Sequence, residues 1–504
     1  MQNHPGEILW TAGFFNERFP APISPLGWSL LGPLIEEIAL REPLRYLGYP
    51  DAENIPLTRL WHGHPYANVL AFQILYKVFP DWILPEDVYR YFPDGDANIR
   101  KRAPYPRSLC SPRFLLSMLR GFLSDPLNFS PLHNYRRWAR YSYEHDRRVI
   151  ALRARMGEHT EGEHTAGDNT GSPLRDVSAR AIFAALREAE DVHRDLLRIH
   201  RWSLMHADLT FGVLKRLTRA WVDCDHADEI VARAVAGAPN KTLEVDAALR
   251  ELADSKFEIQ NSKWRVFLAE HGHRSFSLDI AVPTFAEEPM QVVRLLATAA
   301  DRPPTAAVGA ALCGCPSAVG GLRSLVFDTV LRLARRYVAL RENQRYYWQK
   351  SLAVSRHLYL LLADRLLLDG VIASRDQVFY ATHQELADYF EARLARDALA
   401  ASIAARQAEW RGYVHEFEQS PTASYPAFLR GDVPLSPRSP QQQTWRGRAV
   451  SPGSARGAAR VVRSADDLGR VRSGEILIAP STDPAWTPVF GRIAGLVLDR
   501  KSVV

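Results

Sequence analysis

The chain has 504 residues, enough for more than one domain, because single hydrophobic cores stop growing at about 250–300 residues. A hydrophobic content of 46% and an aromatic content of 10% exclude a wholly disordered protein. The formal charge of +6 comes from 63 basic and 57 acidic residues that are interspersed along the chain. We therefore expect no nucleic-acid partner, and basic clusters such as residues 135–140 are expected to be solvated helix faces.

Cysteine usage and apolar content point to the cytoplasm. Four cysteines in so long a chain are too few for a disulfide framework, so a reducing compartment is expected. The N-terminal residues lack the basic and apolar regions of a signal peptide, and no stretch of about 18 apolar residues offers a membrane helix. The predictions are a cytoplasmic location and no membrane partner.

Helical spacing of apolar residues dominates the chain. Apolar residues recur at three- and four-residue steps from Ile182 to Trp202, after helix-start signals at Ser172-Pro173. A second long helix is predicted from Leu322 to Leu368, and Gly370 is the expected stop signal.

A third helix is predicted from about Thr382 to Ala408, and strand-like alternation is scarce before residue 440. The predicted fold is therefore mainly α, with a large helical domain over residues 1–430. Residues 157–173 are polar and nearly repetitive, which indicates a mobile surface loop inside this domain. The Pro/Ser/Gln-rich residues 431–443 are predicted to be an extended linker.

The pattern changes after the linker to short strands and turns. Strands are predicted at residues 458–462, 476–479 and 494–498, with a helical turn at 464–468. Thr482-Asp483-Pro484 has the form of a helix N-cap followed by proline. This alternation predicts a small α/β domain that is distinct from the helical part.

Residues 445–498 resemble the mobile, or swivelling, domain of phosphoenolpyruvate-utilising enzymes. The resemblance rests on Ser451-Pro452-Gly453, on Gly474-Glu475-Ile476-Leu477 and on the heptapeptide from Thr482 to Pro488. Blocks of the helical part resemble the same family, in particular its phosphoenolpyruvate synthase-like and rifampicin phosphotransferase-like members. These blocks are Trp10–Leu30, Glu270–Pro289, Arg341–Asn343, Asp376–Tyr380 and Glu385–Leu386.

In that family, ATP bound to an ATP-grasp domain phosphorylates a histidine on the mobile domain, which carries the phosphate to an acceptor. The resemblance implies that residues 1–430 form an acceptor-binding domain and residues 444–504 the N-terminal part of a mobile domain. A carrier that serves two distant sites needs a flexible tether, and the linker at 431–443 fits that need. A histidine suits this role because neutral imidazole is a competent nucleophile near neutral pH.

Two departures from the family pattern limit these expectations. The chain has no glycine-rich phosphate loop, so we expect ATP and Mg²⁺ on a partner ATP-grasp subunit or on a missing N-terminal domain, and no cofactor on this chain. No histidine follows His415, so the phosphocarrier histidine is absent and no catalytic residue is assigned. We expect the chain alone to be inactive. A further hypothesis is that residues 499–504 are artefactual, since they back-translate to a common sequencing adapter.

His273 and Arg274 are the candidate substrate-binding residues. They lie in a block that resembles the family, and a planar guanidinium can hold a phosphate or a carboxylate. The alternative is a structural role in bridging helices. No metal site is predicted, because His62-Gly63-His64 is more often a turn or a packed pair, Asp223–Asp228 is more often a polar helix end, and Cys313-Gly314-Cys315 has only two thiols.

The leading hypothesis is a component of an ATP-dependent phosphotransferase that passes phosphate through a phosphohistidine to pyruvate or to a small hydroxyl acceptor. The dedicated pyruvate-binding barrel of the family is not visible, which favours an acceptor other than pyruvate. The alternatives are a non-catalytic helical ligand-binding or regulatory protein, and a nucleic-acid-binding protein with a contiguous basic face.

Overall fold

The computed structural model describes residues 8–77, 91–93, 130–155, 177–290, 292–293, 321–435, 454–479 and 486–498, apart from short gaps within these ranges, and isolated helical residues between 112 and 123. The chain divides into two compact units. Unit 1 contains Met1–Arg201, Ser277–Val282 and Lys350–Ser439, and unit 2 contains Trp202–Phe276, Pro283–Gln349 and Pro440–Val504.

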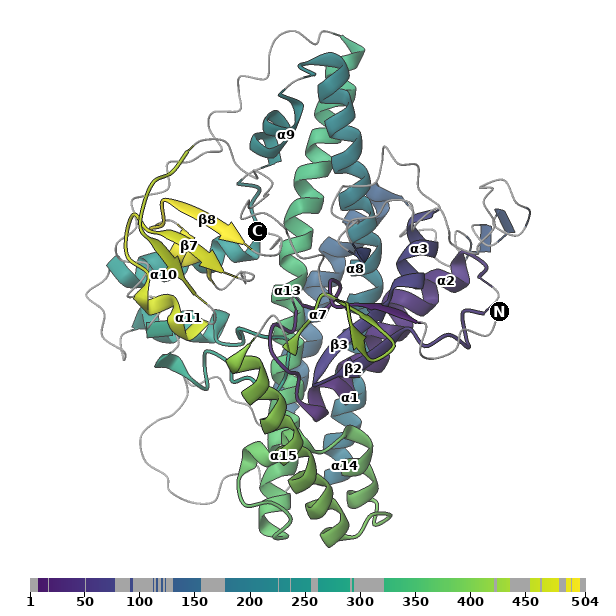
Figure 1. Cartoon of the computed structure of the whole chain (residues 1–504), viewed down its shortest axis with the longest axis vertical. Coiled ribbons are helices and arrows are strands. Elements are labelled where there is room, and N and C mark those ends of the chain that lie inside the picture. Colours follow the sequence, from purple (N-terminus) through teal and green to yellow (C-terminus); the bar gives the residue numbers. More distant parts are fainter. Residues whose placement is uncertain are drawn as a thin grey trace. The chain divides into compact units, whose positions relative to one another are not determined.

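Helices make up most of the described residues (Figure 1). Two long helices, α8 (Ala179–Trp221) and α13 (Leu322–Leu368), contribute residues to both units. Unit 1 also contains α1 (Pro25–Ile35), the π-helix η2 (Glu36–Arg41), α2 (Glu42–Tyr46), α3 (Val69–Lys77), α7 (Pro131–Arg155), the 3₁₀-helix η7 (Arg375–Tyr380), α14 (His383–Phe390) and α15 (Arg396–Gln419). Unit 2 adds α9 (Ala227–Val235), α10 (Lys241–Asp254), α11 (Ser262–His271), η8 (Ala465–Arg470) and α17 (Thr487–Phe490).

Unit 1 contains an antiparallel sheet of five short strands with the order β2-β3-β1-β4-β5. The strands are β1 (Leu9–Thr11), β2 (Thr58–Trp61), β3 (His64–Asn68), β4 (Phe428–Arg430) and β5 (Val433–Pro434). β1 pairs with β3 and with β4, so Leu9 lies opposite Arg430. The sequence predicted a mainly helical first part with little strand-like alternation before residue 440, and it did not reveal this sheet of short strands. Val433–Pro434, at the start of the predicted linker, form β5.

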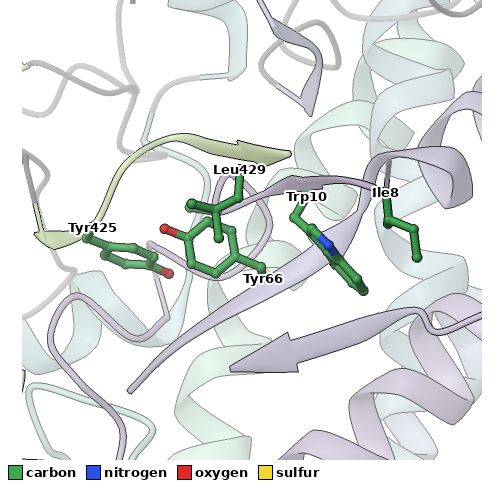
Figure 2. Packing of buried hydrophobic residues seen from close by; sticks show 6 residues of the cluster. Ile8, Trp10, Tyr66, Tyr425 and Leu429 are labelled. Atoms are coloured by element: carbon green, nitrogen blue, oxygen red, sulfur yellow. The ribbon is translucent and has the colours of Figure 1, made fainter. Parts of the chain in front are cut away.

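The sheet covers an aromatic core that joins both ends of unit 1. Ile8, Trp10, Tyr66, Tyr425 and Leu429 pack together as the buried cluster in Figure 2. The hydroxyl of Tyr66 donates to the carbonyl of Pro426 at 2.7 Å, and the hydroxyl of Tyr425 donates to the carbonyl of Pro65 at 3.2 Å. These reciprocal bonds satisfy the buried phenols and fix β3 against the segment before β4.

The β2–β3 hairpin closes at His62 and Gly63, whose φ angles are +47° and +71°. Two consecutive positive φ angles are the signature of the tight hairpin turn that matches strand twist, and glycine adopts them without a steric penalty. His64 follows in β3, fully buried and stacked on Tyr425 with 3.9 Å between the ring centroids. The prediction that His62-Gly63-His64 forms a turn is confirmed.

A buried carboxylate anchors the start of α1 in unit 1. Asp279 accepts hydrogen bonds from the backbone N–H and the hydroxyl of Ser24, both at 2.6 Å, and from the N–H of Ala281 at 3.0 Å. The Ser24 hydroxyl in turn accepts from Gly27 and caps the helix. A Cβ on Gly27 would lie 2.3 Å from an Asp279 oxygen, so this approach requires glycine.

The structure bears out the two long predicted helices and divides the third. The predicted bounds of Leu322–Leu368 agree with α13, and Gly370 has a φ of +69° as a helix stop. The first prediction, from Ile182 to Trp202, lies inside α8. The predicted helix 382–408 is two helices, α14 and α15, because Ala392 between them adopts a φ of +58°.

Unit 2 contains a three-stranded parallel sheet of β6 (Ala459–Val461), β7 (Ile476–Ala479) and β8 (Gly495–Leu498), in that order. Ile476 pairs with Ala459 on one side and with Gly495 on the other. All three predicted strands are therefore present, and they pair with one another in a sheet of their own. The Thr482–Pro484 cap, the 157–173 loop, linker residues 436–443, Cys313-Gly314-Cys315 and residues 499–504 lie outside the described residues.

Backbone contact between glycines sets the spacing of β6 and β7. A Cβ on Gly457 would lie 2.2 Å from the carbonyl oxygen of Gly474, which itself has a φ of +81°. Beside them, Arg460 and Glu475 form a two-pronged ion pair, and hydrogen bonding to Arg460 lowers the pKa of Glu475 to about 2.

Candidate functional site

His273 and Arg274 lie in the turn that follows α11 in unit 2. The turn begins at Gly272, whose N–H donates to the carbonyl of Leu268 at 2.8 Å and prolongs the helix by one bond. A Cβ on Gly272 would lie 2.3 Å from that carbonyl oxygen, so the tight exit from α11 requires glycine. The turn is held on its other side because Ala286 donates to the carbonyl of Gly272 and Phe285 donates to that of Arg274.

Helix α13 supplies the groups that hold the turn in place. The hydroxyl of Tyr346 donates to the carbonyl of Glu270 at 3.2 Å, and its ring meets the His273 imidazole edge-on with centroids 4.5 Å apart. The side chain of Gln349, one turn further along α13, donates to the carbonyl of Ser275. Tyr346 and Gln349 therefore orient the backbone and the imidazole of the turn.

Positive charge gathers around this turn. The Nζ atom of Lys241 lies 5.6 Å from the centre of the Tyr346 ring. Burial alone would lower the pKa of Lys241, but the hydrogen bond to Glu244 and the charges of Glu244, Tyr347 and Glu270 together outweigh burial, and the pKa is raised. Burial lowers the pKa of His271, and the charges of Arg274 and Lys241 act in the same direction although Glu270 opposes them. His271 is thus neutral at pH 7 beside two cations.

The site is closed to solvent in this conformation. Arg274 is 2% exposed, His273 is 6% exposed and Tyr346 is 3% exposed. The burial of Arg274 agrees with the structural alternative for this residue. Its role in holding an anionic ligand stays a prediction.

The sequence identified the turn but not its partners. His271, His273 and Arg274 were visible as a polar run, whereas Tyr346 and Gln349 resemble any other polar or aromatic position on a long helix. The nearby block Arg341–Asn343 was a partial signal. Its last residue, Asn343, accepts a hydrogen bond from the N–H of Lys241 at 2.7 Å and so caps α10 against α13.

Within the residues that the structure describes, no group of three or more His, Cys, Asp or Glu side chains converges as metal ligands. Asp223 and His226 contact each other at 3.1 Å at the exposed end of α8. The same part of the chain contains no helix with the length and apolar character needed to cross a membrane.

The buried turn lies in a part of the chain that is similar to known proteins. The profile of the rifampicin phosphotransferase fourth domain matches residues 255–342, which include the turn and the first part of α13. A rifampicin phosphotransferase from Streptomyces sp is 31% identical over 175 residues, which is 34% of this chain and 19% of that protein. A Bacillus subtilis rifampicin phosphotransferase is 26% identical over 172 residues, or 33% of this chain and 19% of that protein.

A phosphoenolpyruvate synthase from Deinococcus radiodurans is 44% identical over 54 residues, which is 11% of this chain and 7% of that protein. The matched region spans about a fifth of the length of the rifampicin phosphotransferases. Parts of the chain are therefore similar to phosphoenolpyruvate-utilising enzymes, namely to rifampicin phosphotransferases and to a phosphoenolpyruvate synthase.

Proposed function

We propose that the chain is one component of an ATP-dependent phosphotransferase, in which phosphate passes through a phosphohistidine to a small acceptor. The observation that carries this proposal is the match of residues 255–342 to a rifampicin phosphotransferase domain, with the buried turn His271–Arg274 inside it. In this proposal residues 1–430 bind the acceptor in the cytoplasm, residues 431–443 form the linker, of which Val433–Pro434 are paired in β5, and residues 444–504 contribute to the carrier.

The proposed acceptor offers a hydroxyl group rather than the carbonyl of pyruvate. Three of the relatives have rifampicin in their names, and rifampicin is therefore the first acceptor to test. The helical part offers aromatic and imidazole side chains that suit an organic ring system. ATP and Mg²⁺ would be bound by a separate ATP-grasp polypeptide or domain, and the acceptor hydroxyl would lose its proton as it takes the phosphoryl group.

Acceptor binding can be measured by isothermal titration of the purified chain with rifampicin and with pyruvate. We expect heat of binding with rifampicin and none with pyruvate. His273→Ala should weaken binding, whereas His133→Ala, an exposed position on α7, should leave it unchanged. Circular dichroism of each variant checks that the fold is retained. Binding of pyruvate alone would contradict the choice of acceptor.

Phosphate transfer is tested separately with radiolabelled ATP and an ATP-grasp partner. Residues 416–504 contain no histidine, so we expect no stable label on the 444–504 segment. A stable label there would overturn this part of the proposal. Tight binding of an organic ligand with no transfer, even after a histidine-bearing mobile domain is added, would favour the non-catalytic ligand-binding alternative.

A further inference from the structure

Helix α7 has one face packed into unit 1 and an opposite face that is exposed. The buried side chains of α7 include Trp138, Tyr141, His145, Val149 and Leu152. The positions on the other side, 136, 140, 143, 147 and 150, follow steps of four, three, four and three residues. That spacing, 3.5 residues on average, places them along one straight stripe, as in the contact line of a helix pair. We call these five residues the α7 stripe.

The α7 stripe contains three arginines and two large side chains with apolar surface. Tyr143 is 66% exposed and Ile150 is 60% exposed, so both are accessible to a partner. Arg136 and Arg140 precede Tyr143, Arg147 lies between Tyr143 and Ile150, and all three arginines are exposed. The Arg147 guanidinium lies 5.9 Å from the centre of the Tyr143 ring, and Arg140 pairs with Glu144 at 2.7 Å. The stripe therefore has a net positive charge.

We propose that the α7 stripe docks an acidic amphipathic helix of a partner protein. The other face of α7 is buried, so a partner can contact α7 only along its exposed face. The spacing of the stripe suits a second helix that lies along the first. Over 25 residues α7 is about 37 Å long, enough for a contact of several turns. Apolar side chains on the partner would cover Tyr143 and Ile150, and glutamates would face the three arginines.

Charge and spacing argue against other occupants. A second copy of this chain on a twofold axis would bring the same arginines together, and like charges repel. A membrane surface needs a continuous apolar band, but Arg147 separates Tyr143 from Ile150. The phosphates of a nucleic acid could bind the arginines, but Ile150 would then remain in contact with polar groups or water.

The test is the anisotropy of a fluorescein-labelled 25-residue helical peptide, with leucines on one stripe and glutamates beside them, titrated with the full chain. We expect saturable binding that weakens as salt is raised from about 50 to about 200 mM. Arg136→Glu/Arg147→Glu should reduce the affinity roughly tenfold, and Ile150→Ser should do the same. The matched control is Arg396→Glu/Arg411→Glu, which reverses two exposed arginines on α15.

Each comparison gives a decisive result. Equal binding of a scrambled peptide with the same composition, or equal loss of affinity in the α15 control, would overturn the proposal because the stripe would then be irrelevant. Stronger, stripe-dependent binding of single-stranded DNA or of phosphatidylserine vesicles would also overturn it, and would assign the face to nucleic acid or to a membrane. None of these outcomes depends on phosphate transfer.

Discussion

His193 is a buried imidazole held between two serines of α13. Its Nδ1 lies 3.0 Å from the hydroxyl of Ser351, and its Nε2 lies 3.1 Å from the hydroxyl of Ser355. A neutral imidazole can satisfy both contacts by donating to one hydroxyl and accepting from the other. Burial lowers the pKa of His193 to about 3, and the nearby His145 acts in the same direction.

The stability of the protein should therefore depend on His193 in acid. The pKa in the fold is below the unfolded value of 6.5, so the stabilisation is fully present above pH 6.5 and is lost as the pH falls towards 3. This site contributes a slope of up to about 1.4 kcal/mol per pH unit to the free energy of unfolding. Urea unfolding of His193→Gln between pH 7 and pH 4 should show a shallower slope than the parent. His133→Gln, at an exposed position on α7, should keep the parental slope.

Gly272 should tolerate no side chain. In Gly272→Ala the new Cβ would lie 2.3 Å from the carbonyl oxygen of Leu268, and that backbone atom cannot move aside cheaply. We expect a loss of about 2 kcal/mol or more in the free energy of unfolding. Gly412→Ala is the matched control, since no atom lies within 4 Å of its Cβ in the middle of α15. It should stabilise by about 0.5–1 kcal/mol, and similar effects of both changes would contradict the close contact.

At the residue scale, the sequence did not predict which polar residues are buried. His273 and Arg274 were visible as a polar pair next to glycine, and a polar run in a sequence suggests a surface. The structure buries both, and the ring of Tyr346 packs against the His273 imidazole. A contact between residues more than 70 positions apart leaves no trace in local periodicity.

At the element scale, the turn between α14 and α15 contains an unfavourable backbone conformation. Ala392 has a φ of +58°, where a Cβ crowds the following carbonyl. Ala392→Gly should relieve this and raise the free energy of unfolding by about 0.5–1 kcal/mol. Ala398→Gly, two positions inside α15, should lower it by about 1 kcal/mol. Thermal melts of both variants decide the matter, and destabilisation by Ala392→Gly would refute the argument.

The small parallel sheet should depend on the contact between Gly457 and Gly474. Alanine at 457 would place a methyl group 2.2 Å from the Gly474 carbonyl oxygen, so β6 must move away from β7. We expect faster hydrogen exchange at Ile476–Ala479 in Gly457→Ala than in the parent chain. Gly469→Ala, with open space around its Cβ, should exchange as the parent does. Unchanged exchange in both would show that the strands are not held this way.

Elements with strong local signals were predictable, and short paired strands were not. The apolar spacing of α13 and the glycine after it gave its bounds, and the branched residues of β7 gave that strand. Strands β1 to β5 have only two to five residues each, too few to show alternation. Their stability comes from partners far along the chain, which single-sequence patterns do not encode.

At the scale of the whole molecule, unit 1 is assembled from three separate segments of sequence. A chain that ends at Ser439 keeps β4 and β5, whereas a chain that ends at Ser420 lacks both and leaves β1 without its β4 partner. We expect the shorter chain to bind the dye ANS strongly, because Trp10 and Tyr66 lose the cover of Tyr425 and Leu429. The longer chain should bind it weakly. Equal dye binding by the two chains would show that the sheet does not need its last two strands.

Leu9 and Arg430 are neighbours in the sheet, so β1 leaves the ribosome long before β4 has been made. At ~5–20 residues per second, the intervening chain of about 420 residues takes roughly 20–80 s to synthesise. Throughout this time the open edge of the nascent strand and the indole of Trp10 are available to other unfinished chains. Production of this protein should therefore depend on chaperones that cover β1, and slower translation should increase that dependence.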